Sequence, residues 1–223
     1  ENRRFEAVLT PHPGEIPSRP HSGGLLRALG ALDPLEEKGL VIYPLAFRHG
    51  EREEDVHGGA GDAATGVACL DRWLVTQAQQ PVKWDLITFN LGLHELTNGS
   101  HCEGLYREQL TNITKRLVAL NTKLLYISTP PFMPLRTKGN TVVEDMNAIA
   151  ADVVAPYGIP VVDMYSLVTK SCGAIYVNCF ICRVEPCSYH YNAAGMDAQG
   201  QAVAQAIEKA LSFSSHAERP LRS

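Results

Sequence analysis

Several features that would define a protein class are absent from this chain. No apolar run approaches the roughly 20 residues that span a bilayer, so we expect no transmembrane helix. Basic residues are not in excess, because 20 Lys and Arg stand against 24 Asp and Glu. The resulting net charge of -4 argues against a nucleic-acid partner. Internal repeats and low-complexity segments are absent too, and the composition, 45% hydrophobic and 20% charged, is that of an ordinary globular protein.

The chain also begins without an initiator Met and without the apolar segment of a signal peptide. Both a mature form and a truncated fragment fit this beginning. A length of 223 residues suits one domain with a full hydrophobic core. We expect a single domain over residues 1–211, with an atypical N-terminal segment at 1–23 and a polar tail at 212–223.

The cysteines and two sequons point to an oxidising compartment. Four of the six cysteines lie close together, at Cys172, Cys179, Cys182 and Cys187. Asn-x-Ser/Thr sequons occur at Asn98-Gly99-Ser100 and Asn112-Ile113-Thr114. These patterns predict a secreted or luminal glycoprotein with at least one disulfide in the cysteine cluster. The alternative is a cytosolic chain in which the cysteines are free thiols and the sequons arise by chance.

Strand and helix patterns alternate along the chain, which predicts an α/β fold with a parallel sheet covered on both faces. The predicted strands are Ala7–Thr10, Leu40–Pro44, Leu86–Leu91, Leu124–Ser128 and Pro160–Asp163. The predicted helices are Gly24–Leu32, Ala64–Gln79, Glu103–Leu120, Val142–Val154 and an alanine-rich helix from about Ala198 to Leu211. We expect a flavodoxin-like three-layer sandwich with five parallel strands in the order 2-1-3-4-5.

The predicted helix Glu103–Leu120 has the clearest amphipathic pattern. One face carries Tyr106, Leu110, Ile113 and Leu117, and the opposite face carries Glu108, Asn112 and Lys115. This spacing predicts a surface helix with the Asn112 sequon exposed.

Three loops at the predicted carboxyl ends of the strands, where parallel sheets bind ligands, hold candidate site residues. After the third strand, Gly92 lets the backbone approach a substrate, and His94 and Glu95 follow it. After the second strand, Gly58 precedes a helix that Asp62 is placed to cap. A phosphate-binding loop is disfavoured there because no Gly-Lys-Ser/Thr follows.

The third loop contains His190, which is followed by Gly195 and the final helix. A histidine in that place can act as the general base of a serine hydrolase. Zinc is an alternative, because Cys179, Cys182, Cys187 and His190 have ligand-like spacing. Disulfides fit the sequons better, so we expect neither metal nor cofactor.

The blocks Phe89-Asn90-Leu91-Gly92-Leu93-His94-Glu95 and His190 to Gly195 resemble two signature blocks of the SGNH (GDSL-type) hydrolase superfamily. The resemblance runs from about His57 to Ile207. It implies that His190 is the base and that the Gly58 N–H and His94 stabilise the oxyanion. The family usually has Asn and Asp where this chain has His94 and Glu95. The Asp that orients the base is replaced by Cys187, so either Glu185 substitutes for it or His190 works in a dyad.

The family's Gly-Asp-Ser nucleophile block occurs nowhere in the chain. Counting back from the first predicted helix makes Ser18 the best positional candidate for the nucleophile and Ser22 the second.

Two functions follow from this resemblance. The first is a secreted ester hydrolase that cleaves an acylated carbohydrate, lipid or other small ester through a Ser/His mechanism. The second is a catalytically silent module that binds a glycan or lipid in the same cleft.

Overall fold

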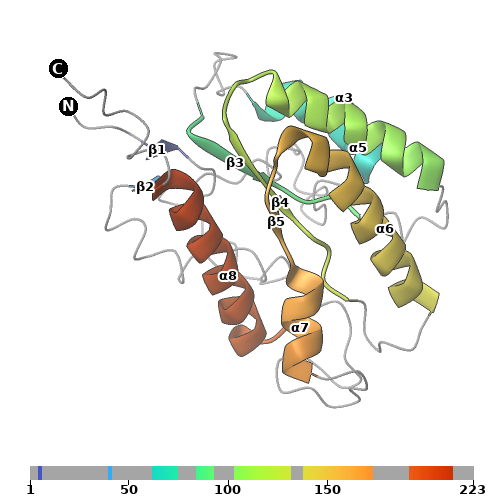
Figure 1. The fold of residues 1–223 in the computed structure, drawn as a ribbon, viewed down its shortest axis with the longest axis vertical. Helices are drawn as coiled ribbons and strands as arrows, with labels where there is room; N and C mark the ends of the chain where they lie inside the picture. The colour runs from blue at the N-terminus through green and yellow to red at the C-terminus, as the bar shows by residue number, and fades with distance from the viewer. Residues whose placement is uncertain are drawn as a thin grey trace, which may run out of the picture.

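The computed structural model describes seven stretches of the chain: residues 5–6, 40–41, 62–74, 84–92, 103–131, 138–172 and 191–212. The predicted helix Gly24–Leu32 lies outside them. Within these residues the elements follow the order β1, β2, α3, β3, α5, β4, α6, η3, β5, α7, α8 (Figure 1). Strands and helices alternate, so the α/β class is confirmed.

The central sheet contains three parallel strands in the order β3-β4-β5. These strands are Leu86–Phe89, Lys123–Ile127 and Val161–Val162. Ile87 pairs with Leu124, and Tyr126 pairs with Val161. The short strands β1 (Phe5–Glu6) and β2 (Leu40–Val41) also pair in parallel. Each of these pairings agrees with the order 2-1-3-4-5. The β1 to β3 neighbourhood is not seen among the described residues, so a continuous five-stranded sheet stays a prediction.

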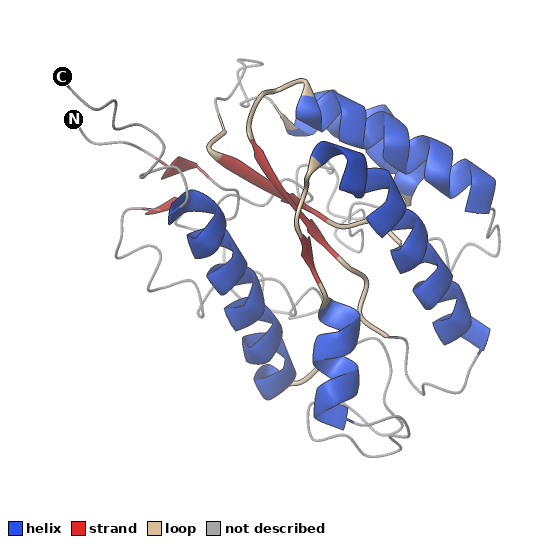
Figure 2. Ribbon diagram, viewed as in Figure 1, coloured by secondary structure: helices blue, strands red, loops and turns tan. Residues whose placement is uncertain are grey.

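Helices cover both faces of the sheet (Figure 2). Three of them pack side by side on one face: α3 (Ala63–Trp73), α5 (Glu103–Val118) and α6 (Lys138–Val154). The opposite face is covered by α8 (Ala193–Ser212), with α7 (Met164–Cys172) beside it. A short 3-10 helix, η3 (Ala155–Tyr157), follows α6 and ends at Gly158 in the left-handed region. The molecule therefore has the three layers expected of this fold.

The alternation of side chains along the strands builds two separate cores. Ile87, Leu124 and Tyr126 join the larger cluster under α3, α5 and α6. Leu86 and Leu125 point the other way and pack with Ala204 and Ile207 of α8. Neighbouring strand residues point to opposite faces, and both faces are buried. This explains why the central strands are continuous apolar runs in the sequence.

Helix α5 confirms its predicted faces. The buried side chains include Tyr106, Leu110, Ile113 and Leu117, while Glu108, Asn112 and Lys115 are exposed. Two surface ion pairs tie this helix to its neighbours, Arg107 to Asp152 of α6 and Arg116 to Asp71 of α3. Pairs of this kind contribute little to stability because water screens them.

Two helices differ from the expectation, and one predicted strand is not tested. A strand is present at Phe5–Glu6, and the predicted strand Ala7–Thr10 lies outside the described residues. Helix α7 was not predicted; its start is capped by Asp163, whose Oδ1 accepts a hydrogen bond from the Ser166 N–H. Helix α8 begins at Ala193, five residues earlier than expected, because the Asn192 side chain accepts from the Gly195 N–H and caps the helix there. Gly195 therefore lies inside the helix and not ahead of it.

Candidate active site

The carboxyl ends of the three central strands lie at one edge of the sheet, because the strands are parallel. The segments that leave this edge are Asn90–Gly92 after β3, Ser128–Pro131 after β4 and Asp163 after β5. Ligands bind at this edge in parallel α/β proteins. The described residues show how each segment is held there.

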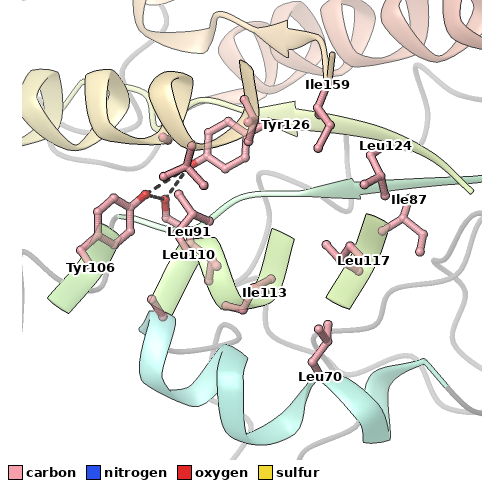
Figure 3. Packing of buried hydrophobic residues seen from close by; sticks show 14 of the residues in the cluster. Leu70, Ile87, Leu91, Tyr106, Leu110, Ile113, Leu117, Leu124, Tyr126 and Ile159 are labelled. Carbon is pink, nitrogen blue, oxygen red and sulfur yellow. Dashed lines mark hydrogen bonds between the residues drawn. The ribbon is translucent and has the colours of Figure 1, made fainter. Parts of the chain in front are cut away.

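The segment after β3 is anchored through the Leu91 carbonyl. The hydroxyls of Tyr106 and Tyr126 donate hydrogen bonds to this oxygen over 2.7 and 2.8 Å, and the two hydroxyl oxygens lie 3.2 Å apart (Figure 3). All three residues are buried. In a trans peptide the C=O and the following N–H point in opposite directions, so the Gly92 N–H is turned away from the tyrosines.

Gly92 itself cannot be replaced without strain. Its backbone φ is +147°, an angle that residues other than Gly rarely adopt. An added Cβ would lie 2.6 Å from Thr129 Oγ1. The backbone after β3 therefore passes in close contact with the segment after β4. The approach of this backbone to a substrate stays a prediction, because the contact seen at Gly92 is with another loop of the protein.

Helix α6 holds the segment after β4. Asn147 Oδ1 accepts from the Thr129 N–H, and Asn147 Nδ2 donates to the Thr129 carbonyl, each over 2.9 Å. Across the sheet, Asn90 Nδ2 donates to the Ile127 carbonyl over 2.6 Å and lies 3.4 Å from Thr129 Oγ1. These amides join the ends of β3 and β4 to each other and to α6.

Two further polar contacts fix the other segments of this edge. Ser128 Oγ accepts from the Met164 N–H over 2.8 Å, which holds the start of α7 against the end of β4. Tyr191 is buried, and its hydroxyl donates to the Pro131 carbonyl over 3.1 Å. Tyr191, which lies just ahead of α8, is therefore held against the loop after β4.

The structure describes two of the site residues predicted from the sequence, Gly92 and Asp62. Asp62 caps α3 by accepting from the Thr65 N–H over 2.9 Å, as predicted. The others lie outside the described residues, so their roles stay predictions: His190, Ser18, Ser22, Gly58, His94, Glu95 and Glu185.

The cysteine and metal predictions are tested only in part. Cys172, the last residue of α7, is disulfide-bonded, and its partner lies outside the described residues. Cys69 is free and buried in α3. The described part of the chain contains no cluster of His, Cys, Asp or Glu that could hold a metal. Cys179, Cys182, Cys187 and His190 are not in that part, so the choice between zinc and disulfides stays open.

Among the helices that the structure describes, none combines the length and the apolar composition of a membrane span.

Sequence reasoning missed the residues that hold this edge in place. Asn90 belongs to a block that carried the resemblance, but Asn147 lies on α6 and its contact with Thr129 spans 18 residues of sequence. Tyr106 was assigned to the core, which is correct, and its additional hydrogen bond to Leu91 carries no signal in the pattern of apolar residues. Such partners can be found only once the elements are packed.

Parallel strands, helices on both faces and loops converging at the carboxyl edge define an α/β protein with its candidate site at that edge. The chain belongs to the GDSL-like lipase/acylhydrolase family, whose model matches residues 38–198, well over half of the sequence. This family consists of acylhydrolases and esterases of the SGNH type, so the resemblance found in the sequence is confirmed.

Solved structures show the same fold. The α/β-hydrolase enzyme LAE5 from the metagenome of Lake Arreo is similar with a TM-score of 0.63 and 15% identity, over 87% of this chain and 86% of that one. A lipase/acylhydrolase from Enterococcus faecalis has a TM-score of 0.60 and 15% identity, over 92% and 93% of the two chains. A catalytic mutant of the acetylxylan esterase Axe2 from Geobacillus stearothermophilus has a TM-score of 0.63 and 12% identity, over 91% and 92%. A comparison with curated protein sequences finds no match.

Proposed function

We propose that this protein hydrolyses small acyl esters, with an acylated carbohydrate as the first candidate substrate and a lipid or other small ester as the next. The proposal depends mainly on one observation: the segments after β3 and β4 are held together at the carboxyl edge by buried hydrogen bonds, and Tyr191, the neighbour of His190 in sequence, is bonded to the same edge. An edge held in this way suits catalysis, which needs groups fixed before the substrate arrives.

The proposed mechanism is acyl transfer to a serine. The Ser18 hydroxyl attacks the ester carbonyl, and His190 takes its proton and passes it to the departing alcohol. The Gly58 N–H and His94 donate hydrogen bonds to the oxyanion. Water, activated by His190, then releases the acid from the acyl-enzyme. The family membership and the esterases named among the similar structures support this reaction class.

The test is turnover of p-nitrophenyl acetate and of acetylated xylooligosaccharides by the purified full chain. We expect hydrolysis of at least one, and a loss of about 10³-fold or more in His190→Ala, because members of such a triad act as a unit. His94→Ala should lower kcat by about 10²-fold, the typical effect of losing one oxyanion donor. Circular dichroism should show that both variants remain folded.

Two serine variants make a matched pair. Ser18→Ala should lose activity as His190→Ala does, whereas Ser22→Ala should keep it. The opposite pattern would move the nucleophile to Ser22. Full turnover in both variants would exclude each of them.

The second candidate function is a silent binding module for a glycan or lipid. It is favoured by the absence of a Gly-Asp-Ser block and by Cys187, which stands where the family has an Asp. In this case the unmutated chain would turn over none of the esters but would bind acetylated oligosaccharides in titration calorimetry.

The proposal places the protein in the secretory lumen or outside the cell. The disulfide bond of Cys172, the nearby cysteines and the two sequons support this placement. Mass spectrometry of the chain isolated without reduction should find Cys172 bridged to a member of its cluster. A fully reduced chain in cell extracts would contradict the placement.

A further inference from the structure

Thr114 of α5 is a buried side chain whose polar atom has no partner. Its residue is 0% exposed, and its Oγ1 makes no hydrogen bond. A buried hydroxyl without a partner destabilises the folded state, since it loses its bonds to water without replacing them. Val has nearly the same shape and a similar helix propensity, and it would avoid this penalty. The folded structure alone therefore gives no reason for Thr at this position.

Trp84 is the other such residue within the described part of the chain, since its Nε1 also lacks a partner. Its case differs, because a large ring fills the core and no apolar residue of equal size exists to replace it. For Thr114 the explanation has to come from a state in which the hydroxyl is accessible, and that state is the unfolded chain.

Thr114 is the third residue of the sequon Asn112-Ile113-Thr114, and Asn112 is exposed. We propose that Asn112 carries an N-linked glycan that is attached before α5 folds, and that Thr114 is retained for the hydroxyl this step requires. The Asn112 amide nitrogen attacks the anomeric carbon of a lipid diphosphate-linked oligosaccharide. The new C–N bond forms, the bond from that carbon to the diphosphate breaks, and the amide nitrogen loses one proton.

The geometry of α5 sets the timing of this reaction. Successive helical residues are about 100° apart, so Asn112 and Thr114 point to nearly opposite sides of the helix. Asn112 faces solvent while Thr114 faces the core. A transferase that must bind the amide and the hydroxyl of one sequon together cannot do so on the folded helix.

The folded protein has room for the glycan once it is attached. Asn112 borders an open groove on the outer surface of α3 and α5, lined also by Val67, Glu108, Gln109, Thr111 and Lys115. It lies on the side of α5 that faces away from the sheet, opposite Tyr106 and Leu110. A glycan there extends into solvent.

The test is expression of the full chain in the endoplasmic reticulum of cultured eukaryotic cells, in an Asn98→Gln background that removes the other sequon. We expect a product whose mobility increases on treatment with a glycosidase that removes N-glycans. Asn112→Gln and Thr114→Val should both abolish this shift, whereas Thr114→Ser should retain it. An unmodified product from the parent chain would overturn the proposal.

The thermal stability of the purified variants supplies a second test, which does not depend on glycosylation in cells. Asn112→Gln and the double variant Asn112→Gln/Thr114→Val both lack the glycan, so their comparison isolates the hydroxyl. We expect the double variant to melt about 2–10 °C higher. A lower Tm would show that Thr114 serves the folded state, which would contradict its proposed role. Modification of the chain by the transferase after folding is complete would overturn the proposed timing.

Discussion

The two helical layers contribute differently to the sheet. On the side of α3, α5 and α6, large side chains form an extensive core, and Tyr106 and Asn147 reach the ends of β3 and β4 with hydrogen bonds. On the other side, the described residues show a small cluster of Leu86, Leu125, Ala204 and Ile207, with α8 contributing mostly alanine and valine around it. Both layers therefore hold strand-end segments, the first through Tyr106 and Asn147 and the second through Met164 and Tyr191, but only the first builds an extensive core among the described residues.

This difference in core size should make the two layers contribute unequally to the stability of the fold. Helix α8, which follows Tyr191 in the sequence, belongs to the layer with the smaller core. The side chains that hold Leu91 and Thr129 come mostly from the opposite layer, through Tyr106 and Asn147. Substitutions in the two layers should differ in size and in kind, and the following variants measure this.

The largest loss should follow Leu110→Ala in α5. Leu110 is fully buried in the larger cluster, so its replacement by Ala would leave a cavity in the core. We expect a decrease of about 3–5 kcal/mol in the free energy of unfolding, measured by denaturant titration. Leu105→Ala on the same helix is the control, because Leu105 is 48% exposed and should change stability by less than about 0.5 kcal/mol. Equal losses in the two variants would contradict the proposed core.

Gly92→Ala should come next, with a loss of about 2–4 kcal/mol from its strained φ and the contact with Thr129. Because the strain lies at the carboxyl edge, esterase turnover should fall further than stability predicts. Gly104→Ala is the matched control: no atom lies within 4 Å of its added Cβ, and stability should stay equal or rise by up to about 1 kcal/mol. A Gly92→Ala variant with normal stability and turnover would remove this residue from the site.

Ile207→Ala on α8 should cost about 2–3 kcal/mol, at the low end of the range for such substitutions. Ile207 belongs to the smaller cluster, so fewer buried side chains lose contacts when it is shortened. The exposed Gln205→Ala on the same helix should leave the unfolding midpoint nearly unchanged. A loss larger than that of Leu110→Ala would reverse the ranking of the two layers.

The smallest single effects should come from Tyr106→Phe and Tyr126→Phe, about 1 kcal/mol each, since each leaves the Leu91 carbonyl with one donor. The double variant leaves that buried oxygen without either hydroxyl. Its loss should exceed the sum of the single losses by about 1 kcal/mol in a double-mutant cycle. Strict additivity would show that the two hydroxyls act independently.

The sequence predicted the elements whose pattern is local and long. The buried strands β3 and β4 differ from their predicted ranges by two residues or fewer, and the buried residues of α5 match the predicted face. Helix α7 was missed because Met164 and Val168 are its only buried side chains, too few to show a period over nine residues. The start of α8 was missed because Gly195 suggested a break, whereas the Asn192 cap decides where the helix begins.

The candidate site was predictable at the level of the loops and not of the contacts between them. The apolar strand followed by Gly92 predicted a loop at the carboxyl edge of the sheet, and the structure places Gly92 at that edge. The hydrogen bonds from Tyr106 and Asn147 depend on how α5 and α6 pack, and no spacing in the sequence encodes that packing.

The most direct test of the proposed Ser/His mechanism is covalent labelling with a fluorophosphonate, which reacts with activated serines, followed by peptide mass spectrometry of the full chain. We predict a single adduct on Ser18 in the unmutated protein and its loss in His190→Ala, because a serine without its base is a weak nucleophile. A folded chain that forms no serine adduct, or forms the same adduct when His190 is replaced, would contradict the proposed mechanism.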